Sequence, residues 1–367
     1  MEIIHYTDNY FDRLVVFLKS NWALNHIIYN KEIFDWQYGG PIGDVTNSLI
    51  IIDKNQILGF LGCIPYSFLV DNEILAGIGF AIWVVDNSLI NTGLGLLLRK
   101  EIESLYGITY VIGINDKVVN TYIKNKYIYS DGLIRYLVPL NLDGFKNLLQ
   151  NDINDNELSY WVRSIHVTCP IVPNDSVNLN TLEKLYIKNI ASCFLLAPYK
   201  QYSFWQWRYI ESKGFKYLFF SSEGGIVIAH IENIHAPHLI NIHKNKCFRF
   251  IEIIPACELI ENFVFDQLLY NLIIGVLSWA RDFGCTIADF QISNLRFDNI
   301  LNKVGFKKQE KNNNINVARL FSPYRQEAKA LNYAYRINSN TNLLLNNSDN
   351  TYFVKSDGDM DRPNWIT

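Results

Sequence analysis

The sequence predicts an α+β protein of two tandem units, each a mostly antiparallel mixed sheet flanked by helices. Three observations lead to this fold class. Three apolar runs with short polar turns stand near the start, a helix opened by two glycines follows them, and the same order of segments recurs later. With 367 residues, 49% of them hydrophobic, the chain can bury two cores.

The first strands are expected in "SLIIID", "ILGFLGCIPYSFLV" and "ILAGIGFAIWVVD", which are joined by the turns "KNQ" and "DNE". A helix follows that should end at Gly107, because glycine favours helix C-termini. Its predicted apolar face is Leu94, Leu97, Leu98, Ile102 and Leu105. The strand "ITYVIGI", the helix "DKVVNTYIKNK" and the strand "GLIRYLVPL" complete the unit.

Matching segments then reappear in the same order. "FDWQY" at 34–38 is echoed by "WQWRY" at 205–209, "FAIWVVD" by "RFIEIIP", and "YIKNKY" by "LNKVGF". We therefore predict a first domain over 1–140, a linker over 141–180, and a second domain over 181–367 whose C-terminal tail contributes to a substrate cleft.

Composition argues against several classes of protein. A net charge of −3 gives no basic surplus for nucleic acid, so none is expected as a partner. The N-terminus lacks a signal-peptide pattern and no apolar run reaches 18 residues, so we expect a cytoplasmic protein without a membrane span. The six cysteines show no CxxC pair and are expected to be reduced and free of zinc. The oligomeric state stays open.

Gly93 and Gly95 weaken the first turn of the helix that they open. A helix start has unpaired amides and a partial positive charge, and glycines allow a phosphate to approach them. The second copy reads "CELIENFVFDQ" at this point, so only the first copy should bind such a ligand. The segment order is unlike a dinucleotide-binding unit, and no GKS or GKT follows.

The stretch "INTGLG", followed by "ITYVIGINDKVVNTYIKNKY", resembles the GCN5-related N-acetyltransferase (GNAT) superfamily and its pyrophosphate loop, (Gln/Arg)xxGx(Gly/Ala). Ile90 replaces the Gln or Arg of that pattern. The resemblance implies acyl-CoA as cofactor and Tyr122 beside its sulfur; the second copy, with Leu301 in place of the tyrosine, would be degenerate. The residues implied for the cofactor are Ile82, Trp83, Val84, Asn91, Thr92, Gly93, Leu94, Gly95, Leu96 and Asn115.

The tail "YFVKSDGDMDRPN" resembles tandem-domain N-acyltransferases that act on dTDP-linked amino sugars in bacterial surface polysaccharide (lipopolysaccharide O-antigen) pathways. This resemblance implies transfer of an acetyl or 3-hydroxybutanoyl type of group to the amine of a nucleotide-linked sugar. The residues predicted to bind that sugar are Trp36, Tyr38, Asp357, Asp359, Asp361 and Arg362.

Acyl transfer needs a neutral amine, stabilisation of an oxyanion and release of a thiolate. Tyr122 is the candidate that hydrogen-bonds the departing sulfur, with aromatic packing as the alternative. For the base, Asp35, Glu252, Asp289 and a water chain stay open, and a buried Glu252 could instead be a structural ion pair.

No metal site is predicted. Asp357, Asp359 and Asp361 form a DxDxD pattern, but no glutamate closes a calcium loop. His235, His238 and His243 are interpreted as part of a turn.

Two other functions remain open. One is a tandem aminoacyl transferase of the peptidoglycan-branching kind, which the acidic balance and the glycine loop disfavour. The other is a module that binds coenzyme A or nucleotide without turnover.

Overall fold

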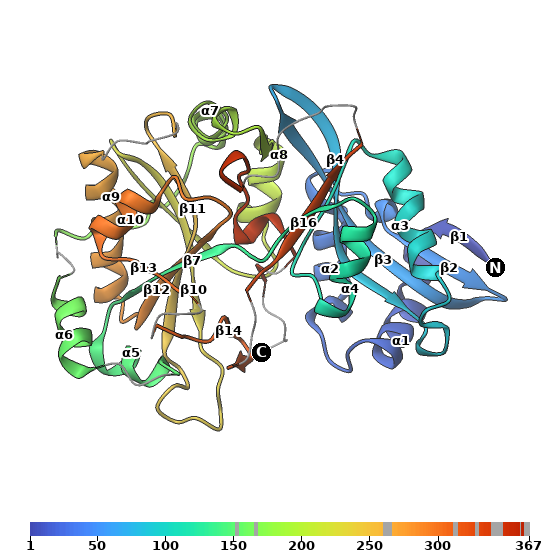
Figure 1. Ribbon diagram of the computed structural model, residues 1–367, viewed down its shortest axis with the longest axis horizontal. Helices are drawn as coiled ribbons and strands as arrows, with labels where there is room; N and C mark the ends of the chain where they lie inside the picture. The colour runs from blue at the N-terminus through green and yellow to red at the C-terminus, as the bar shows by residue number, and fades with distance from the viewer. Residues whose placement is uncertain are drawn as a thin grey trace.

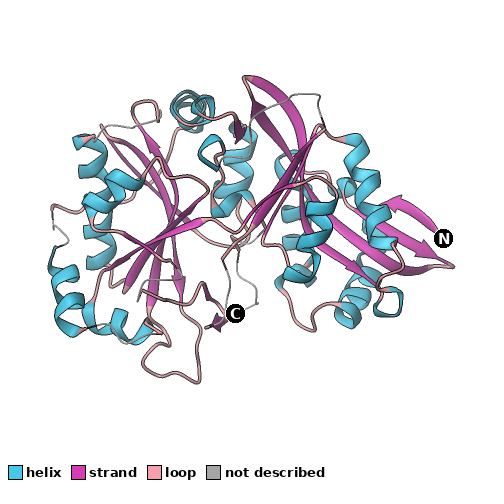
Figure 2. Cartoon of the chain, in the orientation of Figure 1, coloured by secondary structure: helices cyan, strands magenta, loops and turns pink. Residues whose placement is uncertain are grey.

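The computed structural model describes residues 1–150, 154–164, 168–259, 266–310, 315–326, 330–338, 348–359 and 361–362. Their strands form two large sheets that lie side by side with helices packed around them (Figures 1 and 2). Both sheets contain parallel and antiparallel pairs, which confirms the predicted α+β class. Among the described segments, no helix combines the length and the apolar character that crossing a bilayer requires.

The first sheet has the order β1-β2-β3-β4-β5-β16-β6, with β8 paired to β3. Its centre is the long β3–β4 hairpin, which turns at Asp71 and Asn72; both have positive φ, as tight polar turns require. The strands are β1 (Glu2–His5), β2 (Leu49–Asp53), β3 (Gln56–Val70), β4 (Glu73–Val85), β5 (Ile108–Ile112), β6 (Ile128–Ser130), β8 (Leu196–Pro198) and β16 (Tyr333–Ile337).

The second sheet has the order β13-β7-β12-β11-β10-β9. Its members are β7 (Ile134–Pro139), β9 (Tyr217–Ser222), β10 (Gly225–Asn233), β11 (Lys246–Pro255), β12 (Ile287–Ile292) and β13 (Lys307–Lys308), and a separate hairpin joins β14 (Leu320–Phe321) to β15 (Tyr324–Arg325).

The two sheets exchange strands. β7 leaves the first unit and pairs antiparallel with β12, while β16 returns from the C-terminal part and inserts between β5 and β6. Figure 1 shows green β7 within the second sheet and red β16 within the first. The strand predicted over 132–140 therefore exists but belongs to the other sheet, so the pairing crosses the predicted linker over 141–180.

Helices cover both faces of the first sheet. α1 and α2 pack on one face and α3 and α4 on the other, because their buried side chains belong to two separate apolar clusters. The helices of the chain are α1 (Phe11–Asn21), α2 (Lys31–Gly39), α3 (Leu94–Leu105), α4 (Asp116–Lys124), α5 (Leu142–Leu148), α6 (Asp155–Ser164), α7 (Leu179–Asn189), α8 (Tyr202–Trp205), α9 (Gln267–Asp282) and α10 (Asp298–Val304).

The predicted helix over the glycine pair is confirmed as α3, with two corrections. Leu94, Leu98 and Ile102 are buried at a spacing of four residues, whereas Leu97 and Leu105 are 47% and 56% exposed because they lie off this stripe. Gly107 does not cap the helix in a left-handed conformation; its N–H donates to Ala76 O of β4 (3.1 Å).

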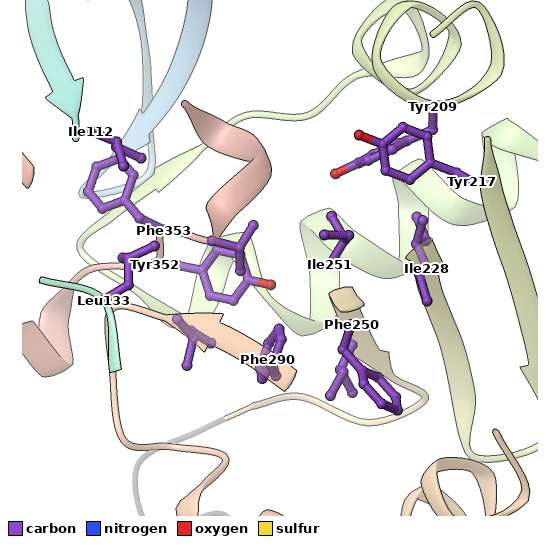
Figure 3. Close-up of a cluster of buried hydrophobic side chains, with 14 of the residues drawn as sticks. Ile112, Leu133, Tyr209, Tyr217, Ile228, Phe250, Ile251, Phe290, Tyr352 and Phe353 are labelled. Atoms are coloured by element: carbon purple, nitrogen blue, oxygen red, sulfur yellow. The ribbon is translucent and has the colours of Figure 1, made fainter. Parts of the chain in front are cut away.

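The C-terminal tail is buried between the two sheets rather than folded over a cleft. Phe353 stacks 5.9 Å from Tyr110 of the first sheet, whereas Tyr352 lies 5.4 Å from Phe194 and donates a hydrogen bond to Glu252 of the second. Figure 3 shows these two neighbouring side chains on opposite sides of the tail. The tail thus joins the two cores.

Candidate functional site

The parallel strands β4 and β5 separate halfway along β4. Their ladder begins at Gly77–Ile108 and ends at Phe80–Val111, so Ala81–Val85 have no partner in β5. On their other edge, Trp83, Val84 and Val85 remain paired with β3. This opening leaves one edge of β4 without a strand partner at Ile82, Trp83 and Val84, the residues expected near the cofactor.

A β-bulge lies at the point of separation. Cys63 pairs with Phe80 and Leu61 with Trp83, so Ala81 and Ile82 of β4 face the single residue Gly62 of β3. Bulges bend a strand and redirect its side chains, and they are frequent beside active sites. Here the bulge lies next to the end of the β4–β5 ladder, so it helps to keep the strands apart.

The start of α3 lies beyond this opening. Its N-cap, Gly93, has φ +89° and offers no side-chain hydrogen bond, and the first helical bond runs from Leu97 N to Gly93 O (3.2 Å). The amides of residues 94–96 precede that bond and are the free donors of a helix start. A Cβ placed on Gly93 would have no described atom within 4 Å, so the approach to these amides is open.

Gly95 has a different role from Gly93. A Cβ at this position would stand 2.8 Å from Trp83 Nε1, which donates to Gly95 O over 3.1 Å. The close approach that requires glycine here is therefore that of an indole ring. Packing against Trp83 explains Gly95, and the left-handed backbone conformation explains Gly93.

Trp83 and Tyr122 meet on the α3 side of the opening. Their rings are 6.0 Å apart and edge-on, and the guanidinium of Arg99 lies 5.8 Å and 5.5 Å from them. Burial raises the pKa of Tyr122, an effect that nearby Arg99 partly offsets. Tyr122 is therefore neutral at physiological pH and has its ring packed, while its role beside the sulfur stays a prediction.

Asn115 is the N-cap of α4, and its side chain accepts a hydrogen bond from Lys117 N (3.0 Å). On the other side of the opening, the Thr92 hydroxyl donates to Leu89 O and Asn91 has φ +70°. These residues shape the loop and helix starts around the opening.

The repeated tryptophans meet where the two units join. Trp36 Nε1 donates to Trp207 O (2.9 Å), Trp207 Nε1 donates to Trp36 O (2.6 Å), and the rings are 5.8 Å apart. Tyr38 is fully buried and packs beside Phe34 and Gly62. Trp36 and Tyr38 are thus mainly core aromatics.

A groove of about 660 Å³ lies beside this tryptophan pair. Asp35 lies on its wall, 41% exposed and 2.5 Å from Lys31 Nζ. The lining residues are Glu32, Asp35, Trp36, Gly40, Pro41, Ile42, Gly43, Tyr202, Ser203, Gln206, Trp207, Glu211 and Lys213.

The acidic side chains of the tail are engaged inside the protein. Asp357 lies 2.7 Å from Lys200 Nζ. Asp361 accepts from Tyr217 OH (2.6 Å) and lies 3.0 Å from His230 Nε2. These two carboxylates face internal partners, and the sugar contacts expected of them stay a prediction.

Asp359 and Arg362 form a second pair within the tail. They lie 3.3 Å apart, and Arg362 Nη1 is 3.1 Å from His26 Nε2. Burial raises the pKa of Asp359, and Arg362 opposes this shift. Both side chains are at least nine-tenths buried, so they lie inside the protein, like Asp357 and Asp361.

Glu252 and Asp289 lie in the second unit inside ion-pair networks. Glu252 contacts Lys200 Nζ and accepts from Tyr209 OH (3.0 Å), and burial raises its pKa. Asp289 Oδ2 lies 2.8 Å from both Arg135 and Arg249. Burial alone would raise the pKa of Asp289, but the two arginines outweigh it and hold the pKa low. Of the three predicted carboxylates, only Asp35 faces an open groove.

Sequence reasoning did not identify Arg99 or Lys200, both fully buried. A signal existed for Arg99, which directly follows Leu98 on the apolar side of α3. His235 and His243 have rings 5.6 Å apart in a loop. Within the described ranges, no three His, Cys, Asp or Glu side chains are grouped to hold a metal ion.

No protein-family model and no curated protein sequence matches the chain. Several solved structures are similar to the chain in fold. A GCN5-related N-acetyltransferase from Anabaena variabilis is 11% identical over 92% of this chain and 72% of its own, with a TM-score of 0.53. A probable N-acyltransferase from Enterococcus faecalis is 9% identical over 92% and 72%, with a TM-score of 0.55.

The N-myristoyltransferase of Saccharomyces cerevisiae, solved with bound myristoyl-CoA, is 10% identical over 100% of this chain and 85% of its own, with a TM-score of 0.54. At these identities the likeness shows the fold alone. The fold is therefore GNAT-like along the whole chain, consistent with two tandem units, as the sequence predicts.

Proposed function

We propose that the protein is a cytoplasmic, acyl-CoA-dependent N-acyltransferase whose cofactor binds to the first unit. The observation that carries this proposal is the opening between β4 and β5 directly before the uncapped start of α3. Free amides at a helix start suit a diphosphate, and the unpaired edge of β4 suits a chain that runs on from it. The structural neighbours, one of them with bound myristoyl-CoA, support the same use of the fold.

The residues at the opening fit this cofactor. Gly93 leaves room for a diphosphate at the amides of residues 94–96, and charge-assisted bonds of this kind contribute about 1.5 to 3 kcal/mol each. Residues 82–84 would supply amides to the oxyanion, where one such donor is worth roughly 3 kcal/mol. The bound thioester supplies the activated acyl group.

In the proposed reaction an amine nitrogen attacks the thioester carbonyl. A C–N bond forms, the C–S bond breaks, and sulfur leaves with the electron pair as a thiolate. The amine gives up one proton to water or to a carboxylate, and the thiolate later takes one up from water. Asp35 is the candidate carboxylate, because Glu252 and Asp289 are held by buried cations.

For the acceptor we propose the amine of a nucleotide-linked sugar such as a dTDP-amino sugar, in bacterial surface polysaccharide synthesis. The tail sequence supports this class. The groove between α2 and α8 adds support, because it offers carboxylates for an ammonium group and aromatic side chains for a ring. Asp35 and Trp36 contribute to it from the first unit.

The test measures release of free thiol from acetyl-CoA with a panel of amino sugars, free and dTDP-linked. We expect release above the buffer rate with a dTDP-linked amino sugar, and a loss of at least tenfold in Asp35→Asn if this carboxylate takes the proton. Binding of coenzyme A without release for any acceptor would favour a binding module. Release with an aminoacyl-tRNA alone would favour the peptidoglycan-branching kind.

A further inference from the structure

Arg99 is a fully buried cation on α3 with two open donors. Its guanidinium lies 5.8 Å from the ring of Trp83, 5.5 Å from that of Tyr122 and 5.4 Å from that of Tyr127. Nη1 and Nη2 have no hydrogen-bond acceptor within the part of the chain that the structure describes. A buried donor without a partner costs free energy, so this arrangement calls for an explanation.

The ion pair between Arg99 and Glu103 does not explain the arrangement. Arg99 Nε lies 2.7 Å from Glu103 Oε1, but that carboxylate also accepts from Tyr127 OH (2.7 Å) and lies 3.2 Å from Arg336 Nη1. Glu103 is thus shared among Arg99, Tyr127 and Arg336. The rest of the Arg99 guanidinium packs against aromatic rings.

The open donors lie beside the opening between β4 and β5. Trp83 comes from β4 beyond the end of the ladder, Tyr122 comes from α4 across the opening, and Arg99 contacts both rings. Trp83 in turn donates from Nε1 to Gly95 O in the first turn of α3 (3.1 Å), so one indole ring separates the Arg99 charge from the helix start at which the cofactor is proposed to bind.

We propose that Arg99 stabilises the thiolate of coenzyme A in this opening, as a charged hydrogen-bond donor to the leaving sulfur. This inference rests on the proposed function and adds a residue to it. The C–S bond breaks, sulfur keeps the electron pair beside the guanidinium, and water later supplies the proton of the free thiol.

Tyr122 alone is a poor candidate for this task. Its pKa is raised by burial, whereas a thiol titrates near 8.5, so transfer of the tyrosine proton to the sulfur is unfavourable. A cation that never deprotonates stabilises a thiolate without any proton transfer.

The experiment measures the affinity of the protein for coenzyme A and for acetyl-CoA by calorimetry between pH 6.5 and 9.5. Acetyl-CoA has no titrating thiol, so the ratio of the two affinities reports the ionisation of the bound sulfur. The variants are Arg99→Met, which removes the charge, and Arg99→Lys, which keeps it. Arg336→Met is the matched control. Arg336 is the other cation that pairs with Glu103, and its side chain is 35% exposed.

In the wild type we expect the ratio to rise with pH as if the bound thiol titrated 1 to 2 units below its free value, a preference of about 10- to 100-fold for the thiolate. Arg99→Met should give a flat ratio, while Arg99→Lys and Arg336→Met should keep most of the rise. A flat ratio in the wild type, or a rise unchanged in Arg99→Met, would overturn the proposal. If Arg99→Met does not fold, Arg99→Gln, which also removes the charge but stays polar, takes its place, and a rise unchanged in Arg99→Gln overturns the proposal. Failure of the wild type to bind either compound would instead refute the proposed function.

Discussion

The two units start their central helices in opposite ways. In the first, α3 begins at Gly93, which has positive φ, no capping side chain and open space before it. In the second, α9 begins at Asp266, whose carboxylate accepts from Leu268 N (2.8 Å) and Leu269 N (3.2 Å). The start of α3 leaves its amides free for an external anion, whereas the amides at the start of α9 are bonded to the carboxylate of Asp266.

The strands beside these helices differ in the same sense. In the second unit the β11–β12 ladder ends at Phe250–Phe290, and Glu252 beyond it is paired with Lys200 and Tyr352. In the first unit Arg99 lies against Trp83 and Tyr122 beside the corresponding opening, and its Nη1 and Nη2 have no hydrogen-bond partner among the described residues. Under the proposed function, the comparison teaches that one fold serves binding in one copy and stability in the other, depending on whether the chain supplies the counter-charge.

The largest effect on stability should come from breaking the buried ion pairs of the second unit. Asp289→Asn would leave Arg135 and Arg249 buried without their shared carboxylate, so we expect a loss of about 3–5 kcal/mol in the free energy of unfolding. Denaturant unfolding measures it. Asp35→Asn, at an exposed pair, should cost less than about 1 kcal/mol; equal losses in both variants would contradict a structural role that is special to Asp289.

The same carboxylate gives a pH dependence. The folded pKa of Asp289 is held below its unfolded value of about 3.9, so its contribution is present above that pH and is lost as the pH falls toward the folded value. The stability gap between wild type and Asp289→Asn should therefore be constant near neutrality and shrink below about pH 4. A gap that grows on acidification would contradict this sign.

Making the first helix start resemble the second should remove cofactor binding. Gly93→Asp places a carboxylate where the diphosphate is proposed to bind, and we expect affinity for coenzyme A to fall by about 100-fold or more. Gly93→Asn is the matched control, because asparagine tolerates positive φ without adding charge, and it should lose about tenfold at most. Calorimetry measures both. Equal affinities in the two variants would argue against an anion site.

Gly95→Val separates the two glycines. The new side chain would press on Trp83, so we expect a loss of roughly 1–3 kcal/mol in stability and a changed tryptophan fluorescence. Leu97→Val, at a position that is 47% exposed, should leave the fluorescence unchanged. An unaltered Trp83 environment in Gly95→Val would return Gly95 to the role first expected, that of admitting phosphate.

The smallest effect should come from opening the second helix start. Asp266→Ala removes the cap of α9 and should cost about 1 kcal/mol in stability, without creating a second site for coenzyme A. Thermal unfolding with and without coenzyme A measures both. A gain of binding would mean that the cap alone distinguishes the two units.

The sequence supports the local part of this fold. Apolar runs, polar turns and the repeat predict the strands and α3, and Gly93 predicts the open helix start. The exchange of β7 and β16 could not be predicted, because their partners are set by pairing across long stretches of chain, more than two hundred residues in the case of β16. The internal partners of the tail could not be predicted for a related reason: only the three-dimensional structure reveals Lys200 and His230 opposite Asp357 and Asp361.

The central claim is that one coenzyme A binds per chain, at the start of α3. The most direct test is a calorimetric titration of the wild type, Gly93→Asp and Asp266→Ala with coenzyme A. We predict one site per chain in the wild type and in Asp266→Ala, and no measurable site in Gly93→Asp. Two equivalent sites in the wild type, or a single site that survives in Gly93→Asp and disappears in Asp266→Ala, would contradict the claim.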